Sequence, residues 1–422
     1  MLVVASGSGL AQLVSFLSLP FISRLYAPSD FGRFAIFSAV CWMIAVLATV
    51  QLEHVIIIPK LNAHANGLVQ LIIIIGFAIS FGSAGICYLS VEWFGIDFGI
   101  KDHSELTCLF VFLTVIGITF TQAFRSWYVR CGNFAMVARG AVITAISTAS
   151  FAISFGVSSF FMFKDNGLII SQSCGLLVTS IYWYCNSKTH GFKGVFPIKV
   201  IRLRCMANMY GRTALILLGS NLFKTSCGRL PHMTISSVVG NVATGFYVMA
   251  EKILSVPALL IGQSIGSVYR NYSKTASRNR EYDNLAKYYW YTVIISVVIS
   301  IPIFLILYLS SPVLFVFLFG DAWSEVGDYA SIIIFGELFV FILSTVEDAT
   351  ILVKRNLYRF LWHALQLLSF ILIFFVFKWL ELGEIKNLLW SFVSVRITFA
   401  LIDFLYFWIY LRKNTVKFSV SV

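Results

Sequence analysis

The chain has 422 residues, of which 59% are hydrophobic and 16% aromatic, whereas only 12% are charged. That share of charged residues is about half of what a soluble domain carries, so the composition excludes a water-soluble fold. The net charge of +12 arises from 31 Lys and Arg against 19 Asp and Glu. Such an excess is compatible with nucleic acid, anionic lipid or an acidic substrate as partner, and the positions of the charges must decide between them.

Twelve long apolar stretches, separated by short polar segments, follow one another along the chain. They cover residues 2–23, 34–52, 67–90, 106–124, 140–163, 166–186, 210–238, 243–268, 288–311, 329–353, 357–377 and 387–411. A helix of about 20 apolar residues crosses the hydrocarbon core of a bilayer. The first stretch has no preceding Lys or Arg and no small-residue cleavage pattern, so we expect it to be a span and not a cleaved signal. The sequence therefore predicts an all-α polytopic membrane protein with about twelve transmembrane helices.

Basic residues are distributed unevenly between the two sides of the membrane. With the N-terminus in the cytoplasm, 21 of the 31 Lys and Arg fall in cytoplasmic segments, six fall outside, and four lie within spans. Lys and Arg close to span ends are retained on the cytoplasmic side, so this distribution predicts that both termini are cytoplasmic. Membrane topology explains the positive charge, and we expect no nucleic-acid partner.

The longest cytoplasmic loop is basic and lies near the middle of the chain. It divides the sequence into an N-terminal six-helix lobe (1–186), a basic cytoplasmic linker (187–208) and a C-terminal six-helix lobe (209–422). The two halves share a weak similarity. Residues 15–20 (SFLSLP) are followed by Gly32, twelve residues after Pro20, and residues 226–231 (SCGRLP) are followed by Gly245, fourteen residues after Pro231. Parallel repeats of this kind predict two lobes of like orientation.

Motifs for metal binding, redox chemistry and nucleotide binding are absent from the sequence. The eight cysteines are scattered singly, the six histidines show no ligand spacing, and there is no Walker A sequence. We therefore predict no metal, no cofactor and no catalytic site, which indicates that the protein is not an enzyme.

Several short segments resemble one family of membrane proteins. Residues 5–12 (ASGSGLAQ) and 19–32 (LPFISRLYAPSDFG) in the first half, and residues 245–252 (GFYVMAEK), Pro257 and residues 260–266 (LIGQSIG) in the second half, carry the likeness. They resemble Wzx-type O-antigen and polysaccharide repeat-unit flippases. These proteins form the polysaccharide biosynthesis family of the multidrug/oligosaccharidyl-lipid/polysaccharide exporter superfamily.

The resemblance implies both a fold and a function. Two six-helix lobes would enclose a central cavity lined by spans 1, 2, 7 and 8. The substrate would be an undecaprenyl-pyrophosphate-linked oligosaccharide, an O-antigen or capsule repeat unit. It would move from the cytoplasmic to the outer leaflet of the bacterial inner membrane by alternating access. Membrane lipids, a glycan polymerase and a chain-length regulator would be partners.

Cationic residues inside the spans are the first candidates for substrate binding. A charged side chain within a span costs about 2.5–3.5 kcal/mol on insertion scales, so each one is a functional candidate. Lys224 and Arg229 on span 7, Lys252 on span 8 and Arg24 at the outer end of span 1 could bind a phosphate. Alternatively, Arg24 and Arg229 anchor their spans at the interface and Lys224 pairs with an acid on a neighbouring span.

Polar and acidic residues complete the candidate site. Gln12, Ser15 and Asn221 could hydrogen-bond sugar or phosphate oxygens, although Ser in a membrane helix is more often a packing residue. Glu251, Glu337 and Asp403 are candidates for proton or cation coupling, and the alternative for Glu251 is a structural ion pair across spans. Arg396 and Asp403 are seven residues apart on one helical face, so we expect a local or inter-helix structural pair.

Two other functions compete with the flippase. A multidrug exporter of the MATE type, a cation antiporter, would favour an acidic cavity for cationic drugs, whereas the candidates here are mainly basic. A membrane glycan polymerase would need a large outside loop to hold its substrate. Every outside loop predicted here is shorter than about 20 residues.

Overall fold

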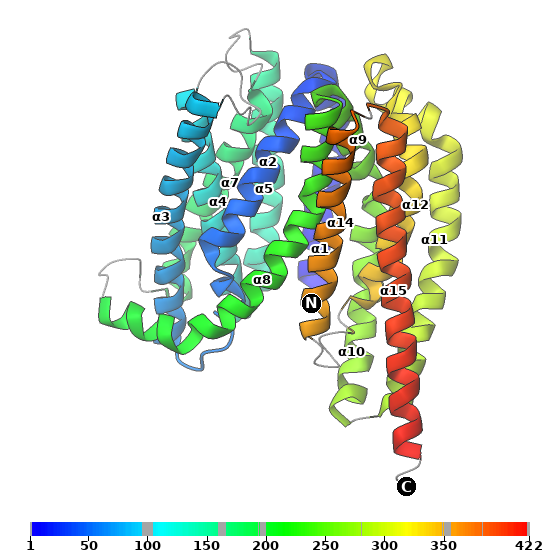
Figure 1. Ribbon diagram of the computed structural model, residues 1–422. Helices are drawn as coiled ribbons and strands as arrows, with labels where there is room; N and C mark the ends of the chain where they lie inside the picture. The colour runs from blue at the N-terminus through cyan, green and yellow to red at the C-terminus, as the bar shows by residue number, and fades with distance from the viewer. Residues whose placement is uncertain are drawn as a thin grey trace. The chain divides into compact units, whose positions relative to one another are not determined.

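The computed structural model describes residues 2–94, 104–158, 166–192, 194, 200–279, 281–347, 349, 356–381 and 383–419. Regular secondary structure in these residues is helical throughout, as the composition predicts. The helices shown in Figure 1 are, in chain order, α1 (Leu2–Leu25), α2 (Pro28–Thr49), η1 (Leu52–His54), α3 (Asn62–Phe94), α4 (Ser104–Arg130), α5 (Phe134–Val157), α7 (Gly167–Ser187), η2 (Lys188–His190), α8 (Val200–Val238), α9 (Asn241–Leu254), η3 (Ala258–Gly262), α10 (Gln263–Asn279), α11 (Tyr282–Phe319), η4 (Asp321–Trp323), α12 (Val326–Val346), α14 (Asn356–Trp379) and α15 (Ile385–Ser419).

The described residues of each of the twelve predicted apolar stretches are mainly helical, and the chain is a multi-pass membrane protein. Residues 159–163, 348 and 350–353 of these stretches lie outside the described residues. Ten helical segments among the described residues are long and apolar enough to cross a membrane. The predicted eighth span corresponds to α9 and α10, which are joined through the short π-helical turn η3. The predicted second span extended to residue 52, whereas α2 ends at Thr49 because Val50 and Gln51 take left-handed backbone conformations.

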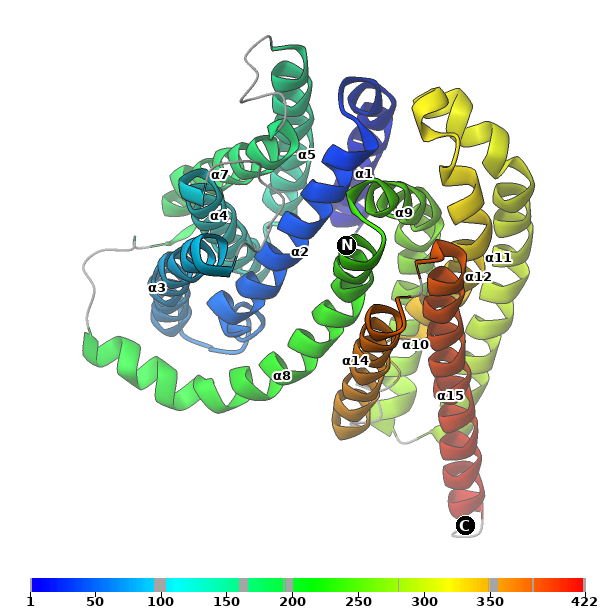
Figure 2. The ribbon, with the colours of Figure 1, turned by 45° about the horizontal axis from the view of Figure 1, so that its top comes forward.

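The chain divides into two compact units, Met1–Met233 (unit 1) and Thr234–Val422 (unit 2). The division falls inside α8. The lobe boundaries expected at residues 186 and 209 remain predictions, and part of the predicted linker, residues 193 and 195–199, lies outside the described residues. α8 is strongly curved in both views of the ribbon (Figures 1 and 2). Pro231 lies inside it, and Pro20 lies inside α1 in the same way.

The core of unit 1 is built from close helix packing and buried polar contacts. The Tyr128 hydroxyl on α4 donates to the carbonyl oxygen of Trp183 on α7 at 2.7 Å. Gly140 on α5 lies directly beneath the Trp183 ring, and a Cβ there would come within 2.1 Å of Trp183 Cζ2. Only a residue without a side chain allows α5 and α7 to approach this closely.

An apolar cluster lies at one end of unit 1. It joins the residues that follow α2 to α3, α4 and the first half of α8. Leu52, Val55 and Trp127 are at most 2% exposed, and Leu203 and Met206 of α8 pack with them. This cluster fixes the turn between α2 and α3 against α8.

In unit 2, the helices of the predicted eighth span pack tightly on α12. A Cβ at Gly262 would lie 2.6 Å from the Ser344 hydroxyl, and one at Gly266 would lie 3.3 Å from the backbone oxygens of Ser344 and Thr345. Because η3 is a π-helical turn, it accommodates one more residue than a regular α-helical turn does. The turn sets the face that α10 presents to α12.

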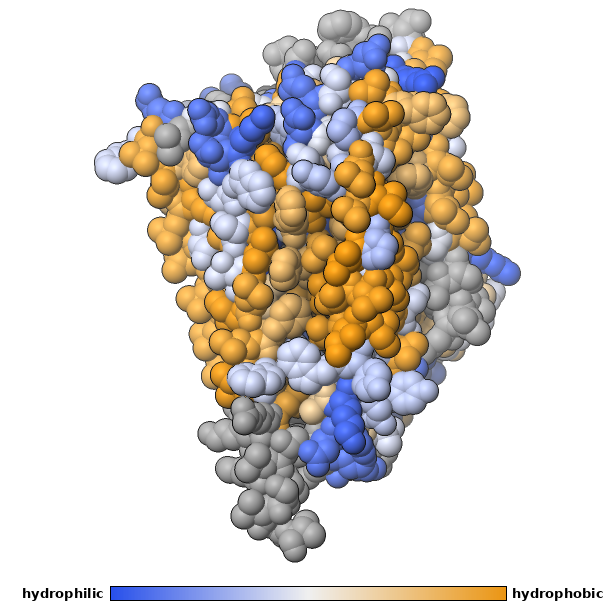
Figure 3. Space-filling view, turned by 90° about the vertical axis from the view of Figure 1, so that its right-hand side faces the viewer, coloured by the Kyte–Doolittle hydropathy of each residue, from blue (hydrophilic) through white to orange (hydrophobic). Residues whose placement is uncertain are grey.

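The lipid-facing surface of unit 2 is apolar. Ile294, Val298, Ile301, Leu305 and Leu309 of α11 recur at intervals of three and four residues and are all more than half exposed. In Figure 3, apolar side chains cover most of the middle of the face drawn, whereas hydrophilic side chains gather towards its two ends. This pattern is expected of helices in contact with acyl chains.

Candidate functional site

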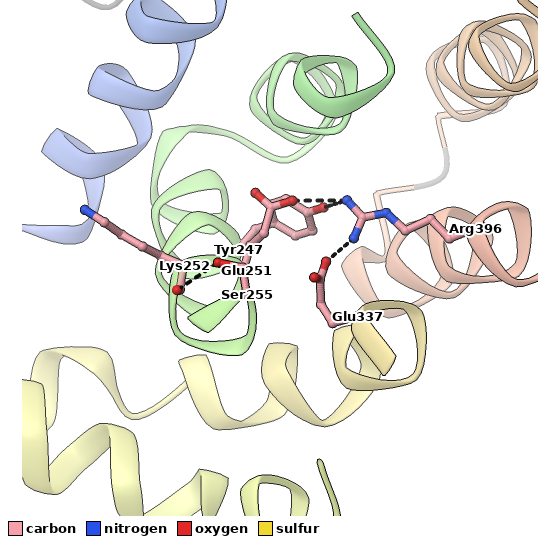
Figure 4. Close-up of polar contacts among 6 residues, drawn as sticks. All are labelled: Tyr247, Glu251, Lys252, Ser255, Glu337 and Arg396. Atoms are coloured by element: carbon pink, nitrogen blue, oxygen red, sulfur yellow. Dashed lines mark hydrogen bonds and ion pairs between the residues drawn. The ribbon is translucent and has the colours of Figure 1, made fainter. Parts of the chain in front are cut away.

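Charged side chains from α9, α12 and α15 meet in unit 2 (Figure 4). Arg396 Nη2 donates to Glu251 Oε1 at 3.0 Å and to the Tyr247 hydroxyl at 3.3 Å, and Arg396 Nη1 donates to Glu337 Oε1. The side chains of Arg396, Glu251 and Glu337 are 11%, 22% and 4% exposed. We refer to Tyr247, Glu251, Glu337 and Arg396 as the Arg396 cluster.

Local sequence explains how these groups come together. Tyr247 and Glu251 are four residues apart on α9, so their side chains lie on one face of that helix. Gly336 precedes Glu337 on α12, and a Cβ there would lie 3.4 Å from Cδ of Arg396. The missing side chain gives the arginine stem room beside α12.

The electrostatics of the Arg396 cluster are unbalanced. One guanidinium faces two carboxylates, so the cluster carries a net charge of −1 when both acids are ionised. A proton or a small cation that binds there would neutralise the excess, and this is the chemistry that ion coupling requires. Within the described residues, no group of three or more His, Cys, Asp or Glu is placed to hold a metal ion.

The structure brings together two of the three acids predicted as coupling candidates. Glu251 and Glu337 share Arg396 although they are far apart in the sequence. The ion pair of Glu251 with Arg396 corresponds to the structural alternative that the sequence left open. The geometry is compatible with either role, and the coupling role stays a prediction.

Asp403, the third acid, has a different environment. Its Oδ1 accepts a hydrogen bond from the Tyr358 hydroxyl of α14 at 2.9 Å, and the Tyr358 ring stacks on Tyr406 with centroids 3.7 Å apart. The expected pair of Arg396 with Asp403 is wrong, because Arg396 is directed to the acids of α9 and α12. The two residues share one face of α15, which is why the pair was expected, but the partners of Arg396 lie on other helices.

Lys252 follows Glu251 on α9 but points away from the Arg396 cluster (Figure 4). Adjacent residues on a helix project about 100° apart, so the two neighbours do not neutralise each other. The Lys252 side chain is exposed. Of the predicted phosphate ligands, Lys252 is the one placed in unit 2.

The other predicted cations lie in unit 1. Arg24 is exposed at the C-terminal end of α1, Lys224 is exposed on α8, and Arg229 on the same helix is half-buried. Lys224 and Arg229 each interact with a neighbouring group. Their roles as phosphate ligands stay predictions.

The predicted polar candidates form contacts within unit 1. Asn221 Nδ2 on α8 donates to Gln51 Oε1 in the turn after α2, so this amide joins two segments of unit 1. The Ser15 hydroxyl donates to the Ala11 carbonyl oxygen of its own helix at 3.0 Å, and both Ser15 and Gln12 are half-buried. The contact of Ser15 is the one a packing serine makes.

Sequence reasoning missed three polar residues that the structure places in buried networks. Tyr247 is 1% exposed in the Arg396 cluster, and Gln51 and Glu53 are 4% and 5% exposed in the turn after α2. Tyr247 lies four residues before Glu251, a helical spacing that could have pointed to it. Glu53 stands at the end of an apolar stretch, where an acid normally marks solvent, so its burial had no local signal.

The arrangement of the apolar helices is a fold known from solved membrane transporters. The structure is similar to an inward-facing multidrug resistance MATE family transporter of the MOP superfamily, with a TM-score of 0.68 and 13% identity over 96% of this chain and 95% of that one. It is similar to the lipid II flippase MurJ in an inward closed conformation, with a TM-score of 0.68 and 13% identity over 100% and 90% of the two chains. A MOP superfamily transporter from Pyrococcus furiosus has a TM-score of 0.56 and 12% identity over 98% and 96%.

The family follows from the sequence match. Residues 21–328 match the model of a polysaccharide biosynthesis protein family, and the chain belongs to that family. The sequence has no significant match among curated proteins. The resemblance noted in the sequence is thus confirmed at the level of the family, and the fold is that of the MOP superfamily transporters.

Proposed function

We propose that this protein is a flippase for an undecaprenyl-pyrophosphate-linked oligosaccharide, an O-antigen or capsule repeat unit. One observation carries the proposal: the chain belongs to a polysaccharide biosynthesis family and has the multi-pass fold of a transporter. The lipid II flippase MurJ has a similar fold, and its name states a lipid cargo. The proposed direction of transport is from the cytoplasmic to the outer leaflet.

A flippase must shelter a charged headgroup from the hydrocarbon core. Moving an unpaired ion into an apolar medium costs tens of kcal/mol in the idealised limit. Exposed cations on otherwise apolar helices reduce this cost, and Arg24, Lys224 and Lys252 have exposed side chains. We propose that they bind the diphosphate, with Arg229, in a central cavity that opens alternately to each side, and that Gln12, Ser15 and Asn221 contribute hydrogen bonds.

The membrane potential favours the proposed direction. An interior that is negative by 100 mV drives each negative charge outwards by about 2.3 kcal/mol if the charge crosses the full field. We propose the Arg396 cluster as an additional coupling site, because one guanidinium is shared by the carboxylates of Glu251 and Glu337. Asp403 is a further candidate for this role.

The proposed function implies a location and partners. The protein would lie in the bacterial inner membrane with both termini in the cytoplasm. A glycan polymerase and a chain-length regulator would use the exported repeat unit on the other side. Membrane lipids would surround the apolar surface of the helices.

Deletion of the gene tests the proposal directly. A strain that lacks the flippase should accumulate the lipid-linked glycan on the cytoplasmic leaflet, where a lectin added to intact spheroplasts does not reach it. Complementation with the wild-type chain should restore lectin binding. Accumulation on the outer leaflet would contradict the proposal and would favour the membrane glycan polymerase as the alternative.

Charge reversal at Arg24 separates a phosphate ligand from an interfacial anchor. Arg24→Glu should stop export at unchanged abundance if the guanidinium binds phosphate. Lys60→Glu, an exposed reversal between α2 and α3, is the matched control and should leave export intact. Normal export by the Arg24 variant would assign the residue to anchoring.

A MATE-type cation antiporter is the second candidate, and the fold similarity to a MATE transporter favours it. The charge of the cargo distinguishes the two functions. Reconstituted protein should bind a prenyl-diphosphate oligosaccharide and not an organic cation such as ethidium. Export of the cation in exchange for protons or sodium ions would favour the antiporter.

A further inference from the structure

The turn that follows α2 has an unusual backbone. Val50 and Gln51 have φ angles of 49° and 58°, so two consecutive residues other than glycine adopt the left-handed conformation. This conformation is uncommon for any residue with a side chain and is a genuine outlier for a β-branched residue such as valine. Such strain persists only where the surrounding structure enforces it. The contacts of this turn therefore hold the backbone in place.

A buried carboxyl group lies within the same turn. The Thr49 hydroxyl donates to Glu53 Oε1 at 3.2 Å, whereas Glu53 Oε2 is buried with no hydrogen-bond partner among the described residues. The Glu53 side chain is 5% exposed, and its neighbours Leu52 and Val55 are at most 2% exposed. An ionised carboxylate in these apolar surroundings lacks both water and a full set of donors, so the neutral acid fits the site better.

Within the described part of the chain, no charged side chain makes a hydrogen bond to the Glu53 carboxyl. The neighbouring elements carry His54 on η1, Lys60 in the following loop, His64 on α3, Arg125 and Arg130 on α4, and Lys224 on α8. Arg130 is committed elsewhere, since its guanidinium donates to the carbonyl oxygens of residues 56, 57 and 60 and to the Asn62 side chain. Desolvation and the charge of Arg125 both lower the pKa of His54. Burial raises the pKa of Glu53 to about 7, although hydrogen bonds from its own backbone and from Thr49 oppose the change.

A hydrogen bond adds to the apolar contacts between this turn and α8. Gln51 follows the strained Val50, and its Oε1 accepts a hydrogen bond from Asn221 Nδ2. The backbone N–H of Gln51 donates to the Thr49 hydroxyl at 3.3 Å, the same hydroxyl that donates to Glu53. The carboxyl, the strained backbone and the contact with α8 therefore form one connected set.

We propose that Glu53 is a proton-binding group whose protonation state controls the turn between α2 and α3. With the proton bound, the neutral carboxyl stays buried and the turn keeps the conformation described here, the closed turn. When the proton leaves to the adjoining aqueous phase, the carboxylate moves towards water, the backbone at Val50 and Gln51 relaxes, and the contact with Asn221 is lost. The inference goes beyond the proposed function, because it depends on no cargo and involves none of the acids predicted from the sequence.

The direction of the pH dependence follows from linkage. The closed turn binds the proton more tightly than an open turn, in which Glu53 has its ordinary pKa of 4.5. The closed turn is therefore fully favoured below about pH 4.5 and loses favour as the pH rises to about 7. The difference between a pKa of 4.5 and one of about 7 corresponds to roughly a 300-fold change in the ratio of closed to open turns.

Hydrogen exchange in the full-length protein, reconstituted in lipid nanodiscs, tests the proposal. Exchange of the backbone amides of residues 50–56, corrected for the intrinsic effect of pH, should accelerate between pH 5 and pH 8 in the wild type. Glu53→Gln imitates the protonated acid and should keep these amides protected at every pH. Glu92→Gln changes an exposed acid at the end of α3 and should behave as the wild type does.

A second variant keeps the test decisive if Glu53→Gln does not fold. Thr49→Val removes the hydroxyl that stabilises the carboxylate, so the midpoint of the exchange profile should move to higher pH. A flat profile in the wild type, an unchanged midpoint in Thr49→Val, or a pH dependence that persists in Glu53→Gln would each overturn the proposal. The measurement requires no transport, so a failed flippase assignment would leave its result unaffected.

Discussion

Replacing Arg396 with methionine removes a cation that Glu251 and Glu337 share. The substitution deletes the hydrogen bonds to Glu251, Glu337 and Tyr247 and leaves an apolar side chain of similar length. Glu337 is 4% exposed and loses its counter-charge completely, whereas Glu251 at 22% exposure retains some access to polar surroundings. We expect Arg396→Met to destabilise unit 2 strongly.

The magnitude follows from the burial of the pair. Breaking a buried ion pair by removing one partner costs about 3–5 kcal/mol. The expected loss is therefore about 4 kcal/mol. Replacing Glu337 with methionine as well should recover part of the loss.

The assay is thermal unfolding of the purified protein in detergent, followed by size-exclusion chromatography with fluorescence detection. A loss of this size should lower the unfolding temperature by roughly 10 °C. Arg359→Met is the matched control, because the ion pair of Arg359 with Glu347, at 2.7 Å, has side chains that are 22% and 41% exposed. Such a pair contributes about 1 kcal/mol or less. Equal stability of the two variants would refute the reasoning.

Three further predictions concern other parts of the chain. Lys224→Ala should abolish glycan export with unchanged abundance in the membrane, as measured by immunoblot and surface glycan staining, and normal export would remove Lys224 from the substrate path. Glu53→Gln should stabilise the protein by about 3 kcal/mol at pH 8 and by almost nothing at pH 4.5. The reason is that the raised pKa of the buried acid disfavours the closed turn only at a pH above the ordinary pKa of the acid. Equal stabilisation at the two pH values in thermal unfolding would contradict this. Gly140→Ala should lower the unfolding temperature because its Cβ would meet the Trp183 ring at 2.1 Å, whereas Gly82→Ala, with no atom within 4 Å, should be neutral or stabilising.

Much of the fold could be predicted because it depends on local composition. An apolar stretch of about 20 residues has to form a helix in lipid, since no water satisfies its backbone groups there. The end of α2 was predicted less well, because the stretch continues through apolar residues while the backbone turns at Val50. Hydropathy does not report a left-handed residue. A contact with α8, through Gln51 and Asn221, fixes that turn.

The candidate site could be predicted only as separate residues. Glu251, Glu337 and Arg396 could each be predicted as functional candidates, because a charged side chain within a span is rare and costs free energy. Their meeting depends on how α9, α12 and α15 pack, and these helices are distant in sequence. From a spacing of seven residues on one helix face, the sequence predicted a pair of Arg396 with Asp403 instead. The packing between helices determined the actual partners.

The π-helical turn η3 holds one residue more than a regular helical turn. If Ala258–Gly262 became regular α-helix at unchanged length, every following residue of α10 would rotate by about 100°. Gly266 would then turn away from Ser344 and Thr345, and a larger neighbour would take its place against α12. Deleting one residue from the turn would instead remove the extra residue, so the segment could continue as a regular helix with Gly266 still facing α12.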